Sequence, residues 1–270
     1  MSPAAPVVDD LGAPVGVGTE PRRLVSLVPN LSELLWEWGL ADRLVGVTEW
    51  CVAPPDGFPG AQRVRGTKNP DVAAIVALEP ELVVANEEEN RARDVERLRA
   101  AGIPVHVTRV RSLAALPGSL RRLGVALGRP EAADGLVAAI ERARGALVAP
   151  ARPRRVVCAV WRDAPAEGGA DEGWWVLGRD TYGADLLTTV GLEVLPPEPD
   201  GRYPRCSFAE LAALAPEVLL LPDEPYAFGP ADVQELQAAG LDARLVDGTS
   251  LWWWGPRTPR ALADLAALAG

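Results

Sequence analysis

The stretch "AAIVALEPELVVANEE", residues 73–88, has the pattern of a short helix, a break at proline and a buried strand. A second stretch of the same design, "AELAALAPEVLLLPDE", occupies residues 209–224, and both contain the signature A-L-x-P-E. Each copy is followed by an L-x-A-A-G helix end and a further strand, within residues 95–108 and 233–247. Because the two signatures recur in the same order at nearly the same separation, we expect two lobes of one design.

Each half also opens with the same kind of unit. "RRLVSLVP" at 22–29 and "RRVVCAVW" at 154–161 are short buried-strand patterns. A helix that ends at a glycine and a second strand follow each of them, within residues 30–48 and 182–196. Strands that alternate with helices indicate parallel β-α units, in which loops at the carboxyl ends of the strands carry ligand groups. The predicted fold class is therefore α/β, with two Rossmann-like lobes that each contain a parallel sheet.

The connection between the halves predicts one long helix. In residues 128–150, Pro130 stands at a helix start, and alanine-rich helical spacing continues until prolines end it. Such a helix would be a rigid strut, roughly 30 Å long at 1.5 Å per residue. The expected domains are a disordered tail over residues 1–21, an N-terminal lobe over 22–127, the connecting helix, and a C-terminal lobe over 151–270. We expect a ligand cleft between the two lobes.

Composition argues against nucleic acid and membranes as partners. The 270 residues include 37 acidic and 27 basic residues, and the formal charge of −10 repels phosphate backbones and anionic lipid surfaces. No stretch is long and apolar enough to span a bilayer, and the first 21 residues lack the features of a secretory signal. The sequence as written therefore predicts a cytoplasmic location, or an extracytoplasmic one if the start is truncated or misassigned. We expect a monomer.

The residues that most often build metal centres and active sites are scarce. His106 is the only histidine and lies in the apolar run "IPVHVT", so we expect a buried strand residue, and sites with two or more histidines are excluded. The chain has no GxGxxG after its first strand, no GxSxG and no P-loop. We therefore expect no enzyme, no metal and no cofactor. Acid chemistry through Glu87 to Glu89 is the least favoured alternative, and a soft-ligand role for Cys51 or Cys206 stays open.

The loops after the predicted strands gather tryptophans and several polar groups. Five of the nine tryptophans lie in these loops, and so does Lys68, the only lysine. An aromatic-rich concavity with few polar anchors suits a large, flat or partly apolar ligand. Simpler interpretations stay open, with "GTKNP" as a turn, "NEEEN" as a solvated helix start and single tryptophans as packing. The ligand-binding candidates are Trp50, Cys51, Thr67, Lys68, Asn69, Glu87, Asn90, Trp161, Trp174, Tyr203, Arg205, Trp252, Trp253, Trp254 and Arg257.

The run "SLWWWGPR", residues 250–257, places three tryptophans side by side. In an extended segment Trp252 and Trp254 would share one face and Trp253 would take the other. Pro256 is expected to begin the last helix. One face of the run should then pack beneath that helix and the other should line the ligand site, and which tryptophan contacts the ligand stays open.

Residues 22–269 resemble the helical-backbone (class III) substrate-binding proteins of ABC importers, a group that carries cobalamin, haem, siderophores or metal ions. The most specific stretches include "RGTKNPD" at 65–71, "NEEEN" at 86–90 and "WWWGPRTPRAL" at 252–262. They are most similar to the cobalamin-binding branch, in which aromatic residues of both lobes enclose the corrin. The resemblance implies a non-catalytic receptor that captures cobalamin or a related corrinoid between two lobes for an ABC importer.

The resemblance also implies a permease as partner. Receptors of this group dock through a carboxylate near the start of a helix on each lobe, and Asp71 and Glu210 lie near those positions. A ferric siderophore or haem receptor is the alternative, since Arg205, Arg257 and Lys68 would suit anionic groups. Metal-ion receptors of the group use histidines, of which this chain has one.

Overall fold

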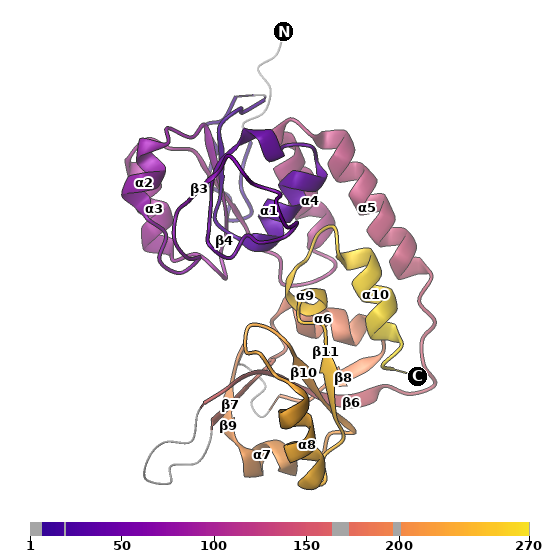
Figure 1. The fold of residues 1–270 in the computed structure, drawn as a ribbon. Helices are drawn as coiled ribbons and strands as arrows, with labels where there is room; N and C mark the ends of the chain where they lie inside the picture. The colour runs from indigo at the N-terminus through magenta and orange to yellow at the C-terminus, as the bar shows by residue number, and fades with distance from the viewer. Residues whose placement is uncertain (1–6, 19, 164–172, 197–200, 270) are drawn as a thin grey trace. The chain divides into compact units, whose positions relative to one another are not determined.

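The structure, a computed structural model, describes residues 7–18, 20–163, 173–196 and 201–269. The chain divides into two compact units, one with residues 1–110 and 114–140 and the other with residues 111–113 and 141–270. We call these units the first lobe and the second lobe (Figure 1). Each lobe is built on one sheet with mainly parallel strands, which confirms the predicted α/β class with two Rossmann-like lobes.

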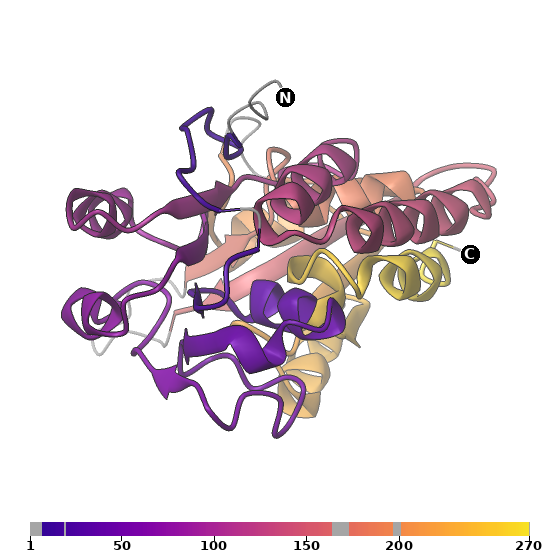
Figure 2. The same ribbon diagram turned by 90° about the horizontal axis from the view of Figure 1, so that it is seen from above.

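The sheet of the first lobe has five parallel strands in the order β3-β2-β1-β4-β5. The strands are β1 (Leu24–Ser26), β2 (Leu44–Val47), β3 (Gln62–Arg63), β4 (Leu82–Asn86) and β5 (Val105–Thr108). The helices are α1 (Pro29–Glu37), η1 (Ala41–Arg43), α2 (Val72–Ala77), α3 (Ala92–Ala100) and α4 (Leu116–Leu127). In Figures 1 and 2, α2 and α3 lie on one face of this sheet, and α1 and α4 lie on the other. The loops after β1, β2 and β4 therefore emerge at one edge of the sheet.

The second lobe has a sheet in the order β11-β10-β6-β7-β9, with β8 paired to β6. The first part of β6 pairs in parallel with β10 and β8, while its last part forms an antiparallel pair with β7. The strands are β6 (Arg154–Arg162), β7 (Gly173–Val176), β8 (Leu192–Val194), β9 (Arg205–Ser207), β10 (Val218–Pro222) and β11 (Ala243–Val246). The helices are α6 (Tyr182–Thr189), α7 (Phe208–Ala213), α8 (Pro230–Ala238), α9 (Thr249–Trp252) and α10 (Thr258–Ala266).

The helix predicted over residues 128–150 is α5, which runs from Pro130 to Gly145. It begins at Pro130, as predicted, after Gly128, with a φ of 67°, ends the preceding helix α4, and it ends a few residues before the expected limit. The boundary between the two lobes falls within α5, between Ile140 and Glu141. The chain therefore passes from one lobe to the other inside continuous helical backbone.

The repeated signature has the same structure in both lobes. Strands β2-β1-β4-β5 of the first lobe correspond in order to β8-β6-β10-β11 of the second. The variable residue of A-L-x-P-E is Glu79 in one copy and Ala215 in the other, and their φ angles are 46° and 47°. The glutamate that ends each signature donates its backbone N–H to an arginine carbonyl at the lobe's first strand, over 2.8 Å in both lobes. Left-handed backbone is unfavourable for residues other than glycine, so its presence at both positions marks one shared local design.

Each lobe has an apolar core of its own. Leu31, Leu34 and Leu35 of α1 are fully buried, and their i, i+3, i+4 spacing places them on the helix face that packs against the first lobe. The core of the second lobe is formed by β6, β7 and β10 with the residues that cover them. It includes Val157, Ala159, Trp174, Val176, Cys206, Leu211, Leu219, Leu221, Phe228, Leu236 and Ala243.

Residues 7–18 pack on the first lobe through two ion pairs whose carboxylates are buried and whose arginines are partly exposed. The carboxylate of Asp9 accepts a hydrogen bond from Arg99 over 2.6 Å, and its side chain is 0% exposed. The carboxylate of Asp10 binds Arg122 at 2.8 Å and is 2% exposed. Buried carboxylates are stable only with such partners, so these two pairs fix the segment in place.

The disordered tail predicted over residues 1–21 is therefore wrong for residues 7–18. The proline, glycine and alanine content suggested a tail, but the arginine partners of Asp9 and Asp10 lie 90 and 112 positions later in the chain. Local composition carries no information on partners that distant. The other parts of the predicted tail at residues 1–6 and 19 lie outside the described residues.

His106 is a buried strand residue, as predicted. It lies in β5, is 0% exposed, and neither ring nitrogen has a hydrogen-bond partner among the described residues. Burial lowers the pKa of this imidazole to about 4, because the charged form loses its hydration. His106 is therefore neutral at physiological pH and inaccessible to a ligand.

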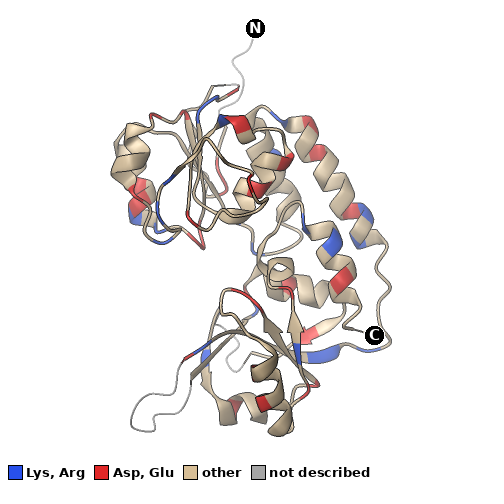
Figure 3. Cartoon of the chain, in the orientation of Figure 1, with Lys and Arg blue, Asp and Glu red and all other residues tan. Residues whose placement is uncertain are grey.

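Both lobes carry residues of both charges. Figure 3 shows basic and acidic positions in each lobe, for example together on α3 and α5 and on α10. Among the described residues, no helix combines the length and hydrophobicity that crossing a membrane requires.

Candidate ligand-binding residues

Trp50 is the most exposed aromatic residue at the loop edge of the first lobe. It follows β2, and 63% of its surface is exposed. Arg63 of β3 holds this turn by donating to the carbonyls of Thr48 and Cys51 over 2.9 and 2.8 Å. A Cβ atom at Gly66 would lie 3.2 Å from the indole Nε1 of Trp50, so glycine there leaves room for the ring. The first lobe thus presents a large apolar ring on a turn held by hydrogen bonds.

The two polar loops singled out from the sequence bind each other. Lys68 donates to the carbonyl of Glu88 over 2.5 Å and lies 3.8 Å from the carboxylate of Glu89. The side-chain amide of Asn90 donates to the carbonyl of Thr67 over 2.9 Å and to that of Leu27 over 3.3 Å. Loops 65–71 and 86–90 therefore form one layer beside the end of β1. The single lysine therefore has a structural role, because it joins its own loop to the loop of Glu88 and Glu89.

Within this layer, accessibility separates the predicted ligand contacts. Lys68 and Asn69 are exposed, and Glu87 is partly exposed. Thr67 and Asn90 are buried, with 9% and 6% of their surface exposed. The side-chain amide of Asn90 donates to two loop carbonyls. The prediction is corrected for Asn90, which shapes the loops from beneath instead of facing a ligand.

Three further candidates are buried. The thiol of Cys51 is 0% exposed and lies 2.9 Å from the Ser32 hydroxyl and 3.1 Å from that of Thr48, and burial raises its pKa. Trp174 is also 0% exposed and stacks on Phe228 with 6.0 Å between ring centroids. The predicted ligand contacts at Cys51 and Trp174 are therefore corrected to core residues. Cys206 is 3% exposed, and burial raises its pKa to about 11, so a soft-ligand role is corrected in the same way.

Trp161 stands at the surface end of an aromatic chain in the second lobe. It lies near the end of β6, is 45% exposed, and meets the edge of Tyr226 with ring centroids 5.3 Å apart. Tyr226 packs on Phe228 at 4.5 Å, and Phe228 stacks on buried Trp174. Aromatic pairs of this kind are worth about 0.5–1.5 kcal/mol each beyond area burial. The core thus holds the exposed ring of Trp161 in a defined place.

Two further candidates, Tyr203 and Arg205, lie at the start of β9. Tyr203 is partly exposed just before β9 begins. Arg205 is exposed and donates to the carboxylate of Asp163 over 3.0 Å. Its guanidinium passes over Gly173 of β7, where an added Cβ would lie 2.2 Å from it. Both candidates stay predictions, with Arg205 already bound to an acid of its own lobe.

The tryptophan run is not extended, contrary to the prediction. Trp252 ends the short helix α9, and the last helix α10 begins at Thr258, two residues later than expected. Trp252 and Trp253 are partly exposed, whereas Trp254 is 4% exposed and is corrected to a core residue. The helical turn separates Trp252 from Trp254, so the alternation of a strand does not apply.

Arg257 stacks on this run. Its guanidinium carbon lies 4.6 Å from the ring centroid of Trp253, and one of its nitrogens donates to the hydroxyl of Thr249 over 2.7 Å. A cation over an indole face is stabilising by about 0.5–2 kcal/mol, depending on solvation. The second lobe therefore offers an aromatic plate with a fixed positive charge.

Glu224 completes this group, and it was not among the sequence candidates. Its backbone carbonyl accepts the indole N–H of Trp252 over 2.8 Å, and burial raises the pKa of its half-buried carboxyl. The repeat contained a signal for it. Glu224 occupies the same place in "AELAALAPEVLLLPDE" as Glu88 does in "AAIVALEPELVVANEE".

The predicted docking residues both lie at helix starts. Asp71 caps α2 by accepting the N–H of Ala74 over 3.0 Å. Glu210 forms a capping box with Ser207 at the start of α7, and these hydrogen bonds lower its pKa. The two helices occupy corresponding places in the repeat. Docking through these carboxylates stays a prediction.

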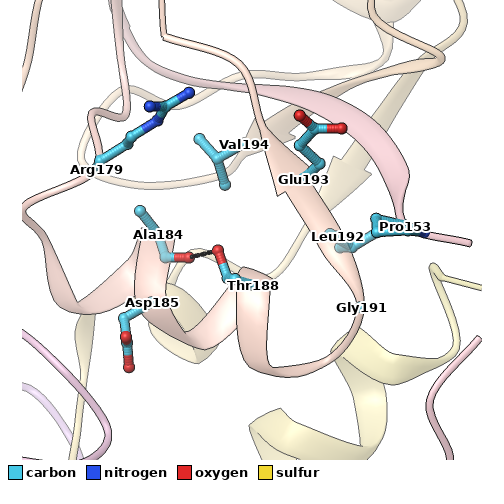
Figure 4. Close-up of a pocket in the computed structure, with 9 residues that line it drawn as sticks. All are labelled: Pro153, Arg179, Ala184, Asp185, Thr188, Gly191, Leu192, Glu193 and Val194. Atoms are coloured by element: carbon cyan, nitrogen blue, oxygen red, sulfur yellow. Dashed lines mark hydrogen bonds between the residues drawn. The ribbon is translucent and has the colours of Figure 1, made fainter. Parts of the chain in front are cut away.

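A separate groove of about 390 Å³ lies between α6 and β8 of the second lobe (Figure 4). Its lining consists of Pro153, Arg179, Ala184, Asp185, Thr188, Gly191, Leu192, Glu193 and Val194. None of these residues is aromatic or among the ligand-binding candidates, so the groove lacks the flat apolar walls that the sequence predicts. Among the described residues, no group of three or more His, Cys, Asp or Glu side chains is placed to hold a metal ion.

Comparison with known proteins gives consistent matches. A model of the Periplasmic binding protein family matches residues 24–240. The Vitamin B12-binding protein of Pectobacterium carotovorum is 31% identical over 114 residues, which cover 42% of this chain and 41% of that protein. The Vitamin B12-binding protein of Vibrio campbellii is 24% identical over 200 residues, covering 73% of this chain and 70% of that protein. The chain thus spans about two fifths of the length of the first curated relatives it matches.

Further similarities concern fold and transport class. An uncharacterised ABC transporter substrate-binding lipoprotein of Bacillus subtilis is 33% identical over 126 residues, or 46% of this chain and 40% of that protein. The solved periplasmic vitamin B12-binding protein of Vibrio cholerae aligns with a TM-score of 0.73 and 20% identity, covering 92% of this chain and 96% of that one. A periplasmic heme-binding protein of Roseiflexus aligns with a TM-score of 0.72 and 24% identity, covering 93% and 97%. At these identities the solved structures establish a shared fold.

Proposed function

Because the chain belongs to the periplasmic binding protein family, we propose that it is a non-catalytic receptor for cobalamin or a related corrinoid. The observation that carries the proposal is the pair of exposed tryptophans, Trp50 and Trp161, at the carboxyl ends of the strands. Each lobe exposes a large apolar ring at its loop edge, although such a ring would be more stable if it were buried inside the lobe. A flat macrocycle with apolar faces would cover such rings.

The scarcity of accessible side chains that could ligate haem iron favours a corrinoid over haem. Haem iron in proteins is held by His, Cys, Met or Tyr side chains. His106 and the three cysteines are buried, and Tyr182 is 4% exposed. Among the described His, Cys, Met and Tyr residues, only Tyr203 and Tyr226 are partly exposed. A corrin holds its cobalt in its own ring and needs no such ligand from the receptor.

We further propose that the receptor serves an ABC permease outside the cytoplasm. The names of its relatives include a periplasmic vitamin B12-binding protein and an ABC transporter substrate-binding lipoprotein, which support this. Asp71 and Glu210 are the candidate docking carboxylates, one at the start of a helix in each lobe.

Titration of the purified protein with cyanocobalamin and cobinamide, followed by tryptophan fluorescence and calorimetry, tests the ligand. We expect saturable quenching with one ligand per chain. The proposal fails if neither corrinoid gives heat or quenching at high micromolar concentration.

Haem is the second candidate, and the cationic plate of Arg257 on Trp253 favours it as a site for a propionate. Haemin titration would then give a shifted Soret band. That shift should disappear in Tyr203→Phe or Tyr226→Phe, because these are the two partly exposed phenols in the part of the chain that the structure describes.

A further inference from the structure

The ring of Trp50 is exposed, but the turn that carries it is closed by one side chain. The Nη1 atom of Arg63 donates to the carbonyl of Thr48 over 2.9 Å and to that of Cys51 over 2.8 Å. These two carbonyls flank Trp50 in the chain. The buried thiol of Cys51 also accepts the hydroxyl of Ser32 in α1 over 2.9 Å. The backbone on both sides of the ring is therefore held by hydrogen bonds.

The ring itself lies against the backbone of the next loop. A Cβ atom at Gly66 would lie 3.2 Å from Nε1 and 3.8 Å from Cδ1 of Trp50, and 2.7 Å from the side-chain oxygen of Asn69. The pyrrole edge of the indole thus faces Gly66, at a distance that leaves no room for a side chain. The N–H of Glu49 donates to the carbonyl of Arg65 over 2.9 Å, which joins the turn to the same loop.

The loop behind the ring is fixed in its turn. The buried amide of Asn90 donates to the carbonyl of Thr67 over 2.9 Å. At the end of the loop, the N–H of Asp71 donates to the carbonyl of Val64 over 2.9 Å. Because the loop is bonded on the side of the core, a side chain added at Gly66 would displace the exposed Trp50 ring instead of the loop.

We propose that Arg63 and Gly66 are positioning residues of the ligand site, which set the Trp50 ring in its binding orientation before a ligand arrives. This inference rests on the proposed function and deepens it, because it names what prepares one of the two exposed rings. A side chain that has to be ordered during binding lowers the affinity, and an orientation already set in the free protein avoids that loss.

The test compares Arg63→Met and Gly66→Ala with two matched controls, Arg93→Met and Gly60→Ala. Arg93 is an exposed arginine of α3 in the same lobe. A Cβ atom at Gly60 would meet nothing within 4 Å. Each of the four changes is also made together with Trp50→Ala, and calorimetry gives the Kd for cobinamide in every variant.

The free protein is followed by NMR, which needs no ligand. The indole N–H resonance of Trp50 is identified by its loss in Trp50→Ala, and its order parameter reports the motion of the ring. We expect Arg63→Met to lower that order parameter and Gly66→Ala to shift the resonance. Arg93→Met and Gly60→Ala should leave both unchanged.

Arg63→Met and Gly66→Ala should each weaken cobinamide binding about threefold to tenfold, the range expected for ordering one side chain on binding. With Trp50→Ala present, the same changes should leave Kd within about twofold, because the ring through which they act is gone. Arg63→Lys should restore the wild-type values, since one nitrogen serves both carbonyls and an ammonium group can replace it.

The inference is overturned if the Trp50 indole signal is the same in Arg63→Met, Gly66→Ala and the wild type. It is also overturned if their losses of affinity persist in full with Trp50→Ala present, since the two residues would then act without the ring. If the wild type does not bind cobinamide, the proposed function fails, whereas the indole signal of the free variants still decides the positioning role. Should Arg63→Met not fold, Gly66→Ala and its control decide both measurements.

Discussion

Replacement of Trp50 by alanine should weaken ligand binding without destabilising the protein. A tryptophan offers roughly 250 Å² of surface. Because 63% of Trp50 is exposed, about 150 Å² is open to a ligand. A ligand that covers half of this area removes about 75 Å² from water, worth about 2 kcal/mol at 25 cal/mol per Å². The expected loss is about 30-fold in Kd.

The assay is calorimetric titration with cobinamide, paired with thermal unfolding followed by circular dichroism. Trp36 of α1 provides a matched control, since it is 40% exposed but lies in a helix instead of a strand-end loop. Trp36→Ala should leave Kd within about twofold of the wild type, as expected for a surface change away from a site.

A drop in the unfolding temperature of Trp50→Ala with unchanged Kd would refute the reasoning. It would show that the ring stabilises its own turn and has no part in the ligand face. Equal losses of affinity in the Trp36 and Trp50 variants would refute it too, because the effect would then not depend on the loop edge.

Three other predictions concern stability. Trp174→Ala should cost about 3–5 kcal/mol of unfolding free energy in urea, because it empties a fully buried site, and a cost below about 1 kcal/mol would contradict core packing. Asp10→Ala leaves Arg122 without its buried partner and should lower the free energy of unfolding by about 2 kcal/mol. Hydrogen exchange at the amides of β5 should become faster. Unchanged exchange would mean that residues 7–18 are not anchored there. His106 has a folded pKa of about 4 against an unfolded value near 6.5, so the unfolded chain binds the proton first as pH falls. Its contribution to stability is complete above about pH 6.5 and is lost toward pH 4, by about 3 kcal/mol, and His106→Phe should flatten that part of a urea–pH series.

The fold could be predicted because its signals are local or repeated. The A-L-x-P-E stretches each carry a helix, a break and a strand within sixteen residues, and their recurrence predicts the second lobe from the first. The structure confirms two lobes built on this pattern and adds that Glu79 and Ala215, at the same place in each copy, both have left-handed backbone. Hydrophobic periodicity likewise indicated α1, whose buried leucines follow helical spacing.

The site was harder to predict because exposure depends on neighbours that are distant in sequence. Trp50 and Trp174 look alike in the sequence, yet one is 63% exposed and the other 0%. Trp174 is covered by Phe228, more than fifty positions later, and no local pattern encodes that contact. The ion pairs of Asp9 and Asp10 were missed for the same reason.

The paired left-handed residues also allow a question about folding cooperativity. Glu79 and Ala215 hold equivalent strained positions in separate lobes, and glycine at either place would relieve the strain by about 1 kcal/mol. Glu79→Gly and Ala215→Gly thus relieve the same backbone strain, once in each half of the chain. If the two lobes unfold as one cooperative unit, either substitution raises the temperature of a single unfolding transition. If the lobes unfold independently, each substitution raises only the unfolding temperature of the lobe that contains it. The internal duplication therefore supplies two equivalent positions, each of which reports on the unfolding of its own half of the chain.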